Sequence, residues 1–458
     1  MPRTARHSPV AGRGKLSRRE SLRLAAAGIA GCSFSGWLET LADDVAANPA
    51  RRRSCILLWM NGGPSQMDTF DLKPGHANGG PFKEIESSVP GVRISEHLPK
   101  LAKQMEHVAI VRSMSTKEGD HSRATYLMRT GYLQQGPIRY PSLGSLVAKE
   151  LGSGDPELPN FVSVAPYRLL NQAAFGPGFL GPQYAPLVVG DAAFPVAQRD
   201  GQQSDYNLKV DDLKPPIGVS SSDADDRLEL WNWLEQGFVS RHATAAAFSH
   251  RTAYDRAVKM MRSEASRAFD LDDEPSALRD AYGRNRFGQG CLMARRLVER
   301  GVPFIEVSLS GVANNQALGW DTHANNFDSV RRLSEVLDPA WATLIEDLKS
   351  RGLLDTTLIV WMGEFGRTPK INPNNGRDHF PAAWTTVLSG GGIRGGQAIG
   401  RTSPDGMTVE ERPVGVPDLL ATVCLALGID HRKQNMSELG RPIRIVDKDA
   451  QPIQEVVA

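Results

Sequence analysis

The sequence predicts an α/β fold with a central, mostly parallel β-sheet and helices on both faces. Short, fully apolar runs recur along the chain and stop at glycine, asparagine or proline, which is typical of strands buried on both faces. Between these runs, apolar residues recur every three or four positions, which indicates amphipathic helices. Alternation of buried strand and helix favours a parallel sheet, whose ligands bind at the carboxyl ends of the strands.

The elements follow from these two patterns in chain order. Strands are expected at residues 55–60, 107–114, 160–165, 302–309, 356–363 and 384–391. Helices are expected at residues 98–107, 122–130, 143–151, over most of 227–300, at 327–351 and at 418–427. Gly352 is a natural end for the long helix before it. The proline- and glycine-rich stretch 166–216 is expected to be surface loop or an extended flap.

Composition limits the classes of function. A chain of 458 residues can form one large α/β domain or two ordinary ones. The formal net charge is +1, so no global basic field indicates a nucleic-acid partner. No apolar run is long enough to predict a transmembrane helix in the mature protein.

The N-terminus is typical of a targeting segment. Residues 1–23 are basic, and Arg18 and Arg19 precede a short, mildly apolar stretch at 24–31. This order predicts a twin-arginine export signal and spacer over residues 1–47, and a periplasmic or cell-envelope protein. A disordered basic tail is the alternative. The folded domain is expected over residues 48–458, with 166–300 as an insertion of loop and helices.

The four cysteines form no CxxC pair. Cys55, Cys291 and Cys424 lie in strand-like or helical patterns and are expected to be buried apolar thiols. Cys32 ends an Ile-Ala-Gly-Cys sequence that resembles a lipoprotein cleavage box. Two interpretations of Cys32 stay open: a lipid anchor, or a cysteine in a discarded signal.

The strongest functional signals are three loop motifs near the C-terminal end: GWDTH at 319–323, GEFGRTP at 363–369 and GRDHF at 376–380. Carboxylates and imidazoles at the ends of buried strands are the ligands that a divalent metal ion needs. The predicted metal ligands are Asp321, His323, Glu364, Asp378 and His379. The ion could be Zn, Mn, Ca or Mg.

Each motif has a structural alternative. Asp321 and His323 are two residues apart, so in an extended loop both side chains point the same way. The alternative is that Asp321 caps a helix and His323 is a surface residue, which would give the same sequence. Glu364 follows an apolar strand and is a ligand, a general base or the ion-pair partner of Arg367.

The N-terminal half supplies further candidates. Asn61 ends the first expected strand and Asp68 lies just downstream, so both are candidate metal ligands. Asp120, His121, Ser122 and Arg123 begin an expected helix, whose N-terminus attracts anions. The planar guanidinium of Arg123 suits phosphate or sulfate. The alternative for Asp120 is a helix N-cap.

These motifs resemble those of known families. The segment TTLIVWMGEFG, followed by a loop histidine, resembles the alkaline phosphatase and sulfatase superfamily. More closely, the mature chain resembles the sulfatase-like family called domain of unknown function 1501, through GGPSQMDTFDLKP, FGQGCLMARRLVERGVPF, WDTH, GEFGRTP and GRDHFP. The resemblance implies an alkaline phosphatase-like fold and a metal-dependent hydrolase of phosphate or sulfate esters.

The chain also departs from the superfamily pattern. Gly119, Asp120 and His121 stand where a nucleophile is expected, Asn61 replaces a metal-binding aspartate, and Phe365 replaces a histidine. His121 as nucleophile or ligand, Ser122 as nucleophile, or a loss of activity all stay open.

Two functions are therefore compatible with the sequence. In the first, Asp321, His323, Glu364 and His379 bind metal, Asp68, Asp120 and His121 complete the site, and Arg123 and Arg367 hold the anion of a small-molecule or glycan ester. In the second, the chain is a catalytically inactive binding or scaffold protein, related to glycans. The sequence does not indicate the oligomeric state.

Overall fold

The computed structural model describes residues 53–154, 156–190, 208, 210, 213, 218–242, 245–312 and 318–458. Every described residue belongs to the compact unit formed by residues 50–458. The predicted export signal and spacer at residues 1–47, and Cys32 with its two open interpretations, lie outside the described residues.

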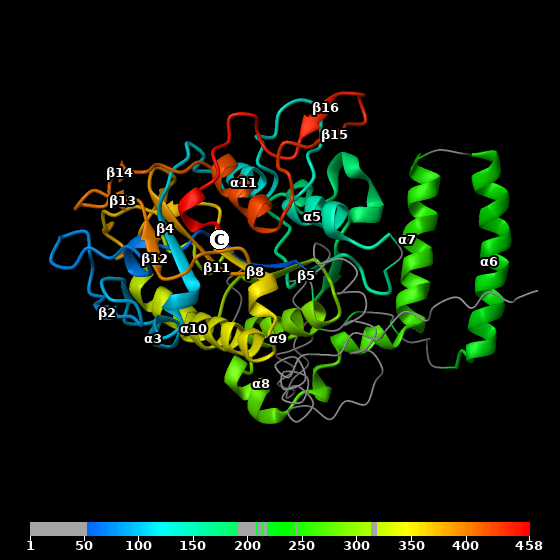
Figure 1. Cartoon of the computed structure of the whole chain (residues 1–458), viewed down its shortest axis with the longest axis horizontal. Helices are drawn as coiled ribbons and strands as arrows, with labels where there is room; N and C mark the ends of the chain where they lie inside the picture. Colours follow the sequence, from blue (N-terminus) through cyan, green and yellow to red (C-terminus); the bar gives the residue numbers. More distant parts are fainter. Residues whose placement is uncertain are drawn as a thin grey trace, which may run out of the picture. The chain divides into compact units, whose positions relative to one another are not determined.

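The centre of the fold is an eight-stranded sheet in the order β12-β4-β11-β8-β1-β7-β5-β6 (Figure 1). The strands are β1 (Ser54–Met60), β4 (Val108–Met114), β5 (Phe161–Val164), β6 (Leu187–Val189), β7 (Phe304–Leu309), β8 (Thr357–Met362), β11 (Trp384–Gly390) and β12 (Gln397–Ile399). Only β11 runs antiparallel to its neighbours. All six predicted strands are present, and the mostly parallel sheet is confirmed.

Helices cover both faces of the sheet. They are α3 (Pro99–Ala102), α4 (His121–Thr130), α5 (Leu143–Leu151), α6 (Ser221–Arg241), α7 (Ala245–Arg262), α8 (Ser276–Tyr282), α9 (Arg286–Glu299), α10 (Asn326–Ser350) and α11 (Val416–Ala426). Alternate residues of β1 belong to two different cores: Ile56 and Leu58 pack with α9 and α10, whereas Leu57 and Trp59 pack with α5 and α11. This two-sided burial is why β1 is continuously apolar.

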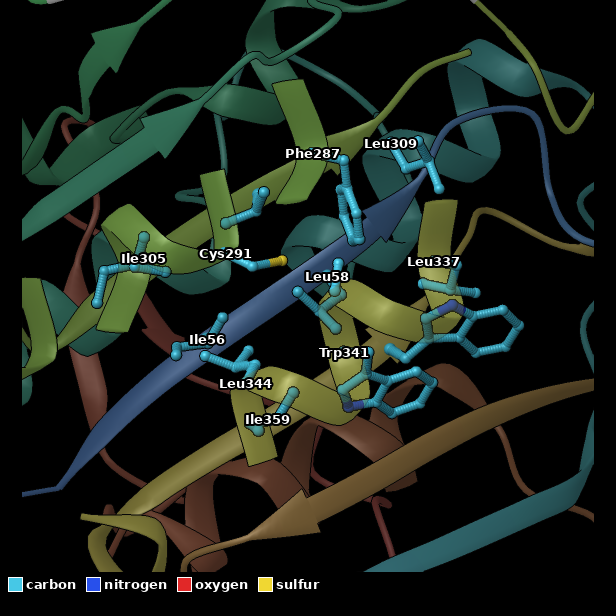
Figure 2. Packing of buried hydrophobic residues seen from close by; sticks show 14 of the residues in the cluster. Ile56, Leu58, Phe287, Cys291, Ile305, Leu309, Leu337, Trp341, Leu344 and Ile359 are labelled. Carbon is cyan, nitrogen blue, oxygen red and sulfur yellow. The ribbon is translucent and has the colours of Figure 1, made fainter. Parts of the chain in front are cut away.

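Figure 2 shows the first of these cores. Ile56 and Leu58 of β1 lie against Cys291 of α9 and Trp341 and Leu344 of α10. Cys55, Cys291 and Cys424 are buried free thiols, as predicted.

In the described part of the chain, four short two-stranded hairpins lie outside the central sheet. They pair β2 (Glu84–Glu86) with β3 (Arg93–Ser95), β9 (Gly366–Arg367) with β10 (His379–Phe380), β13 (Arg401–Thr402) with β14 (Val409–Glu411), and β15 (Gln434–Met436) with β16 (Pro442–Arg444). The β9–β10 hairpin matters for function, because it sets His379 opposite Arg367.

Some elements differ from the prediction. The helix expected at 98–107 is only one turn, α3, followed by a 3-10 turn at Met105–His107, because the chain must already enter β4 at Val108. The stretch 166–216, expected to be loop, contains β6, whose Leu-Val-Val run pairs in parallel with β5. Within 166–300, β6 joins the central sheet and α9 packs on it.

The reversed direction of β11 brings a loop to the functional edge. Because β11 is antiparallel to β8, its first residue, Trp384, lies at the edge where β4 ends at Met114. The loop before β11, which carries His379, therefore meets the loops that follow β1, β7 and β8. Within the described part of the chain, no helix is long and apolar enough to cross a membrane.

Candidate metal centre

Five side chains from four strand ends meet at this edge. Asp321 and His323 lie in the loop after β7, and Glu364 follows β8. His379 belongs to β10, just before β11, and His121 is the first residue of α4, after β4. Residues that are far apart in the sequence thus share one site, because parallel strands end at the same edge.

Glycines allow the loops to approach closely. Gly62 has φ +108°, and a Cβ there would lie 2.4 Å from the backbone nitrogen of Asp321. A Cβ on Gly376 would lie 2.0 Å from the carbonyl oxygen of His323. Neither position can hold a larger residue without moving the loop that carries Asp321 and His323.

One carboxylate oxygen is the focus of the cluster. Asp321 Oδ1 lies 3.3 Å from His121 Nε2, 3.0 Å from His323 Nε2 and 3.2 Å from His379 Nε2. The Nε2 atoms of His323 and His379 are 3.0 Å apart. Three imidazole nitrogens thus lie within 3.3 Å of one carboxylate oxygen.

The other nitrogen of each ring is held by an acceptor. His121 Nδ1 lies 2.7 Å from Glu364 Oε1, His379 Nδ1 lies 2.8 Å from the Gly119 carbonyl oxygen, and His323 Nδ1 lies 2.8 Å from Asp378 Oδ1. Carbonyl and carboxylate oxygens only accept, so each Nδ1 donates its hydrogen. In the neutral imidazoles, the Nε2 lone pairs must then face Asp321.

This arrangement calls for positive charge. Lone pairs that converge at about 3 Å repel one another unless a cation or a proton lies among them. His121 Nε2 is buried and makes no hydrogen bond. Burial disfavours protonation of His121, but the carboxylates of Asp321 and Glu364 outweigh burial and raise its pKa to about 9.

The same partners act on Asp321. Burial would raise its pKa, but His121, His379 and Arg367 hold the pKa of this carboxyl well below its usual range. Asp321 is therefore ionised, which suits a ligand for a cation.

The donor atoms fit a transition metal ion. Ligands about 2.0–2.1 Å from a tetrahedral zinc ion lie roughly 3.3 Å from one another. Four of the distances among these atoms, at 3.0–3.3 Å, are close to that edge length. His121, Asp321 and His379 offer ligand atoms that all lie within 4.8 Å of one another. His323, with 46% of its side chain exposed, lies at the mouth of the cluster.

Glu364 stands behind His121 and does not face the cluster. Its Oε1 accepts hydrogen bonds from the Gly62 N–H at 3.0 Å and from His121, while Oε2 is buried without a partner. A carboxylate that holds the far nitrogen of a ligating histidine is a frequent feature of metal sites.

Arg367 pairs with Asp321, not with its sequence neighbour Glu364. Its Nη2 lies 2.6 Å from Asp321 Oδ1, and its other donors bind the carbonyls of Gly62, Gly63 and Arg377. The side chain is fully buried, so its donors serve the loops and Asp321 and not an incoming anion.

The histidines pack on an aromatic ring. Phe365 lies 4.9 Å from the ring of His121 and 4.7 Å from that of His379, measured between ring centroids. Phe365 thus forms an apolar floor that helps to set both imidazole orientations.

Two predicted ligands in the N-terminal half lie outside the cluster. The amide of Asn61 accepts from Trp59 Nε1 at 2.8 Å and donates to Ser310 Oγ at 2.8 Å. Asp68 forms a buried ion pair with Arg377. Asp378 is half exposed and contacts the cluster only through His323.

The residues around His121 have structural contacts of their own. Asp120 caps α4 by accepting from the Arg123 N–H at 3.1 Å, which is the N-cap alternative. Asn171 donates to the hydroxyl of Ser122, and exposed Arg123 pairs with Glu118. Of these four predicted residues, the structure brings only His121 into the cluster.

Three functional positions were missed at the sequence level: Gly62, the Gly119 carbonyl and Phe365. The Asn-Gly-Gly turn was a visible signal for Gly62, since it indicates a special backbone conformation. No sequence signal identifies the Gly119 carbonyl as a histidine partner. Two cavities, of about 310 and 730 Å³, are lined by other residues.

Comparison with known proteins identifies the family. The chain belongs to the family described as "Protein of unknown function (DUF1501)", whose model matches residues 52–457. The family resemblance seen in the motifs is thereby confirmed. In sequence, no curated protein is significantly similar to the chain.

Several solved structures are similar over most of the chain. The lipoteichoic acid synthase LtaP from Listeria monocytogenes is 10% identical, with coverage of 87% of this chain and 76% of that one and a TM-score of 0.38. The PsFucS1 sulfatase from Pseudoalteromonas sp. is 14% identical, with coverage of 89% and 72% and a TM-score of 0.39. The periplasmic domain of EcEptC from Escherichia coli, in complex with Zn, is 10% identical, with coverage of 82% of both chains and a TM-score of 0.37.

Proposed function

We propose that His121, His323, His379 and Asp321 bind one first-row transition metal ion, and that the chain uses this ion to hydrolyse phosphate or sulfate esters. One observation carries the metal site. Each of the three imidazoles donates Nδ1–H to an acceptor and aims Nε2 at the same carboxylate oxygen of Asp321.

The donor set favours zinc among the four ions considered from the sequence. Imidazole nitrogen suits Zn, Fe, Cu and Ni, whereas Ca and Mg prefer oxygen ligands. Three of the four donors are imidazole nitrogens, and the spacings fit zinc–ligand distances.

The residues of the chain have distinct parts in this proposal. A bound ion would polarise the ester oxygen and lower the pKa of a water molecule if a coordination position beyond its four protein ligands were open to them. Glu364 holds the ring of His121, Gly119 holds that of His379, and Arg367 offsets the charge of Asp321. Exposed His323 lies where an ester would enter.

The ester-hydrolase part rests on the resemblance of the motifs to sulfatases and phosphatases. A catalytically inactive binding protein on the same fold, related to glycans, is the second candidate. It is favoured by the contacts of Ser122 with Asn171 and of Arg123 with Glu118, since neither side chain is aimed at the cluster. Export through the twin-arginine route, to the periplasm or cell envelope, belongs to both proposals.

Metal analysis tests the site directly. We expect the purified chain to hold about one zinc ion, and His379→Ala to lower metal affinity about 100-fold or more, because one of only four protein ligands is lost. His107→Ala is the matched control: His107 also contacts a carboxylate, Glu106, but lies outside the cluster.

Metal content that is equal in His379→Ala and His107→Ala would reject the site. Activity is then screened with chromogenic phosphate and sulfate esters, before and after chelation and return of zinc. Zinc-dependent hydrolysis supports the hydrolase. A chain that binds metal but cleaves none of the esters supports the binding protein instead.

A further inference from the structure

Helix α6 packs on α7 with some of its apolar side chains, and among the described residues it leaves others largely exposed. On the inner face, the ring of Trp231 stacks on that of Tyr254 in α7 at 4.1 Å, and Val239 is buried. Asp225 forms an ion pair with Arg262 of α7. These contacts hold α6 to α7 along its length.

Four large apolar side chains of α6 are exposed, and Trp233 lies farthest around the helix from Trp231. Leu230 is 58% exposed, Trp233 71%, Leu234 55% and Phe238 46%. Residues two apart on an α-helix point about 200° away from each other, so Leu230 and Trp233 lie across the helix from Leu228 and Trp231. The spacing 230, 233, 234 and 238 makes one continuous stripe. An apolar stripe of this size on a soluble helix indicates a binding surface.

The ends of this stripe carry opposite charges. Asp226 lies one turn before Leu230, and Arg241 lies nearly one turn after Phe238, both on the same face by helical spacing. Arg227 lies at the margin of the acidic end, and Asp223 on the same face is engaged in the helix cap with Ser220. Along the stripe the order is therefore acid, apolar, base.

A helix face with this order of charges is complementary to the same face of a second copy that runs in the opposite direction. The midpoint of positions 226 and 241 falls between Trp233 and Leu234, which is also the middle of the apolar stripe. A two-fold axis there would place Asp226 opposite Arg241 of a second copy at both ends, and Trp233 opposite Leu234 at the centre.

We propose that the outer face of α6 binds α6 of a second copy in antiparallel orientation, so that the chain forms a two-fold symmetric dimer. Trp233, the most exposed of the four, is its central anchor, as aromatic side chains often are at interfaces. The charge of α6 argues against an anionic membrane as the occupant, since the helix has five acidic residues and two arginines. The dimer does not depend on the proposed metal centre, because none of its residues belongs to that cluster.

Sedimentation velocity on the full chain tests the proposal. We expect the wild type to dimerise at micromolar concentration, and Trp233→Asp to raise the dimer dissociation constant about 30-fold or more, since it puts a charge at the centre of the interface. Leu439→Asp is the matched control: Leu439 is 55% exposed and lies outside α6, so this variant should dimerise as the wild type does.

Charge exchange tests the orientation. Asp226→Arg and Arg241→Asp should each weaken the dimer by placing like charges opposite each other, and the double variant should restore it. A parallel or unrelated interface would not show this restoration.

Three results would overturn the proposal: a wild type that stays monomeric at 100 μM or so, a Trp233→Asp variant that dimerises as the control does, or a double variant without restoration. Binding of the monomer to vesicles of anionic phospholipid through Trp233 would assign the stripe to a membrane and would also overturn it. An unchanged midpoint of urea denaturation in Trp233→Asp would show that the variant is folded.

Discussion

Two buried carboxylates at the same edge of the sheet have opposite surroundings. Asp68 accepts from Arg377 Nε at 2.7 Å, Arg377 Nη2 at 3.0 Å and Asn326 Nδ2 at 2.9 Å, so both of its oxygens are satisfied. Glu364 accepts from Gly62 N–H and His121 Nδ1 on one oxygen, and its other oxygen has no partner.

The difference separates a structural ion pair from a functional group. A buried charge is tolerated when an opposite charge and hydrogen bonds surround it, as they do for Asp68. Glu364 instead contacts an imidazole whose far nitrogen also lacks a hydrogen-bond partner. Two buried polar atoms without a hydrogen bond, Glu364 Oε2 and His121 Nε2, thus lie beside the ionised Asp321, which favours a cation at this place.

The largest effect should come from Asp68. Asp68→Asn leaves the fully buried Arg377 without its counter-charge and should lower the free energy of unfolding by about 3 kcal/mol or more, measured by urea denaturation. Asp328→Asn, which removes a carboxylate from an exposed ion pair with Arg331, is the control and should change little. Metal content in the folded fraction should not change. A loss of metal with unchanged stability would show that Asp68 is a ligand after all.

A smaller effect concerns His121 in chelator-treated protein. Asp321, Glu364, His379 and Arg367 surround this ring, and its folded pKa of about 9 lies above the unfolded value near 6.5. Protonation of His121 therefore stabilises the fold fully below about pH 6.5, and this contribution, about 3 kcal/mol, is lost as pH rises through 9.

The difference in unfolding free energy between about pH 6 and pH 10 should therefore be larger for the wild type than for His121→Gln. Equal pH dependence in the two proteins would mean that the carboxylates do not favour a cation at this position. Saturating zinc should flatten the wild-type dependence, because metal and proton compete for the same nitrogen.

The smallest effect should come from Glu364. Glu364→Gln keeps an acceptor for Gly62 and His121 but removes the negative charge, so metal affinity should fall about 10–100-fold while the ion is still bound. Competition with a fluorescent zinc chelator measures this change. Complete loss of metal would place Glu364 among the direct ligands, and no change would remove it from the site.

Much of the fold could be predicted because buried strands and helices produce recognisable local patterns of apolar residues in the sequence. The runs at β1, β7 and β8 are mostly apolar and are buried at every position, as expected of strands that are covered on both faces. The direction of β11 could not be read in this way, since an apolar run looks the same in either direction. That direction decides that His379 precedes its strand and still reaches the edge where the others end.

The sequence predicted which types of residue form the candidate site, but not which of these residues contact one another. Asp321, His323 and His379 were identified because carboxylates and imidazoles after buried strands are costly without a partner. Glu364 and Asp68 are also carboxylates near strand ends, and nothing in the sequence says that one binds an imidazole and the other a guanidinium. Arg367 likewise pairs across loops with Asp321 and not with Glu364, three positions away.

By itself, the sequence determined the α/β class, the positions of the main strands and helices, and the family, because periodicity and motifs are local properties of the chain. Only the tertiary structure decided which polar groups meet. It turned three Nε2 atoms toward one oxygen of Asp321, placed Glu364 behind His121, and left one face of α6 uncovered. Which side chains come into contact depends on how strands and loops that are distant in the sequence pack together. The distances between those side chains cannot be derived from local sequence patterns.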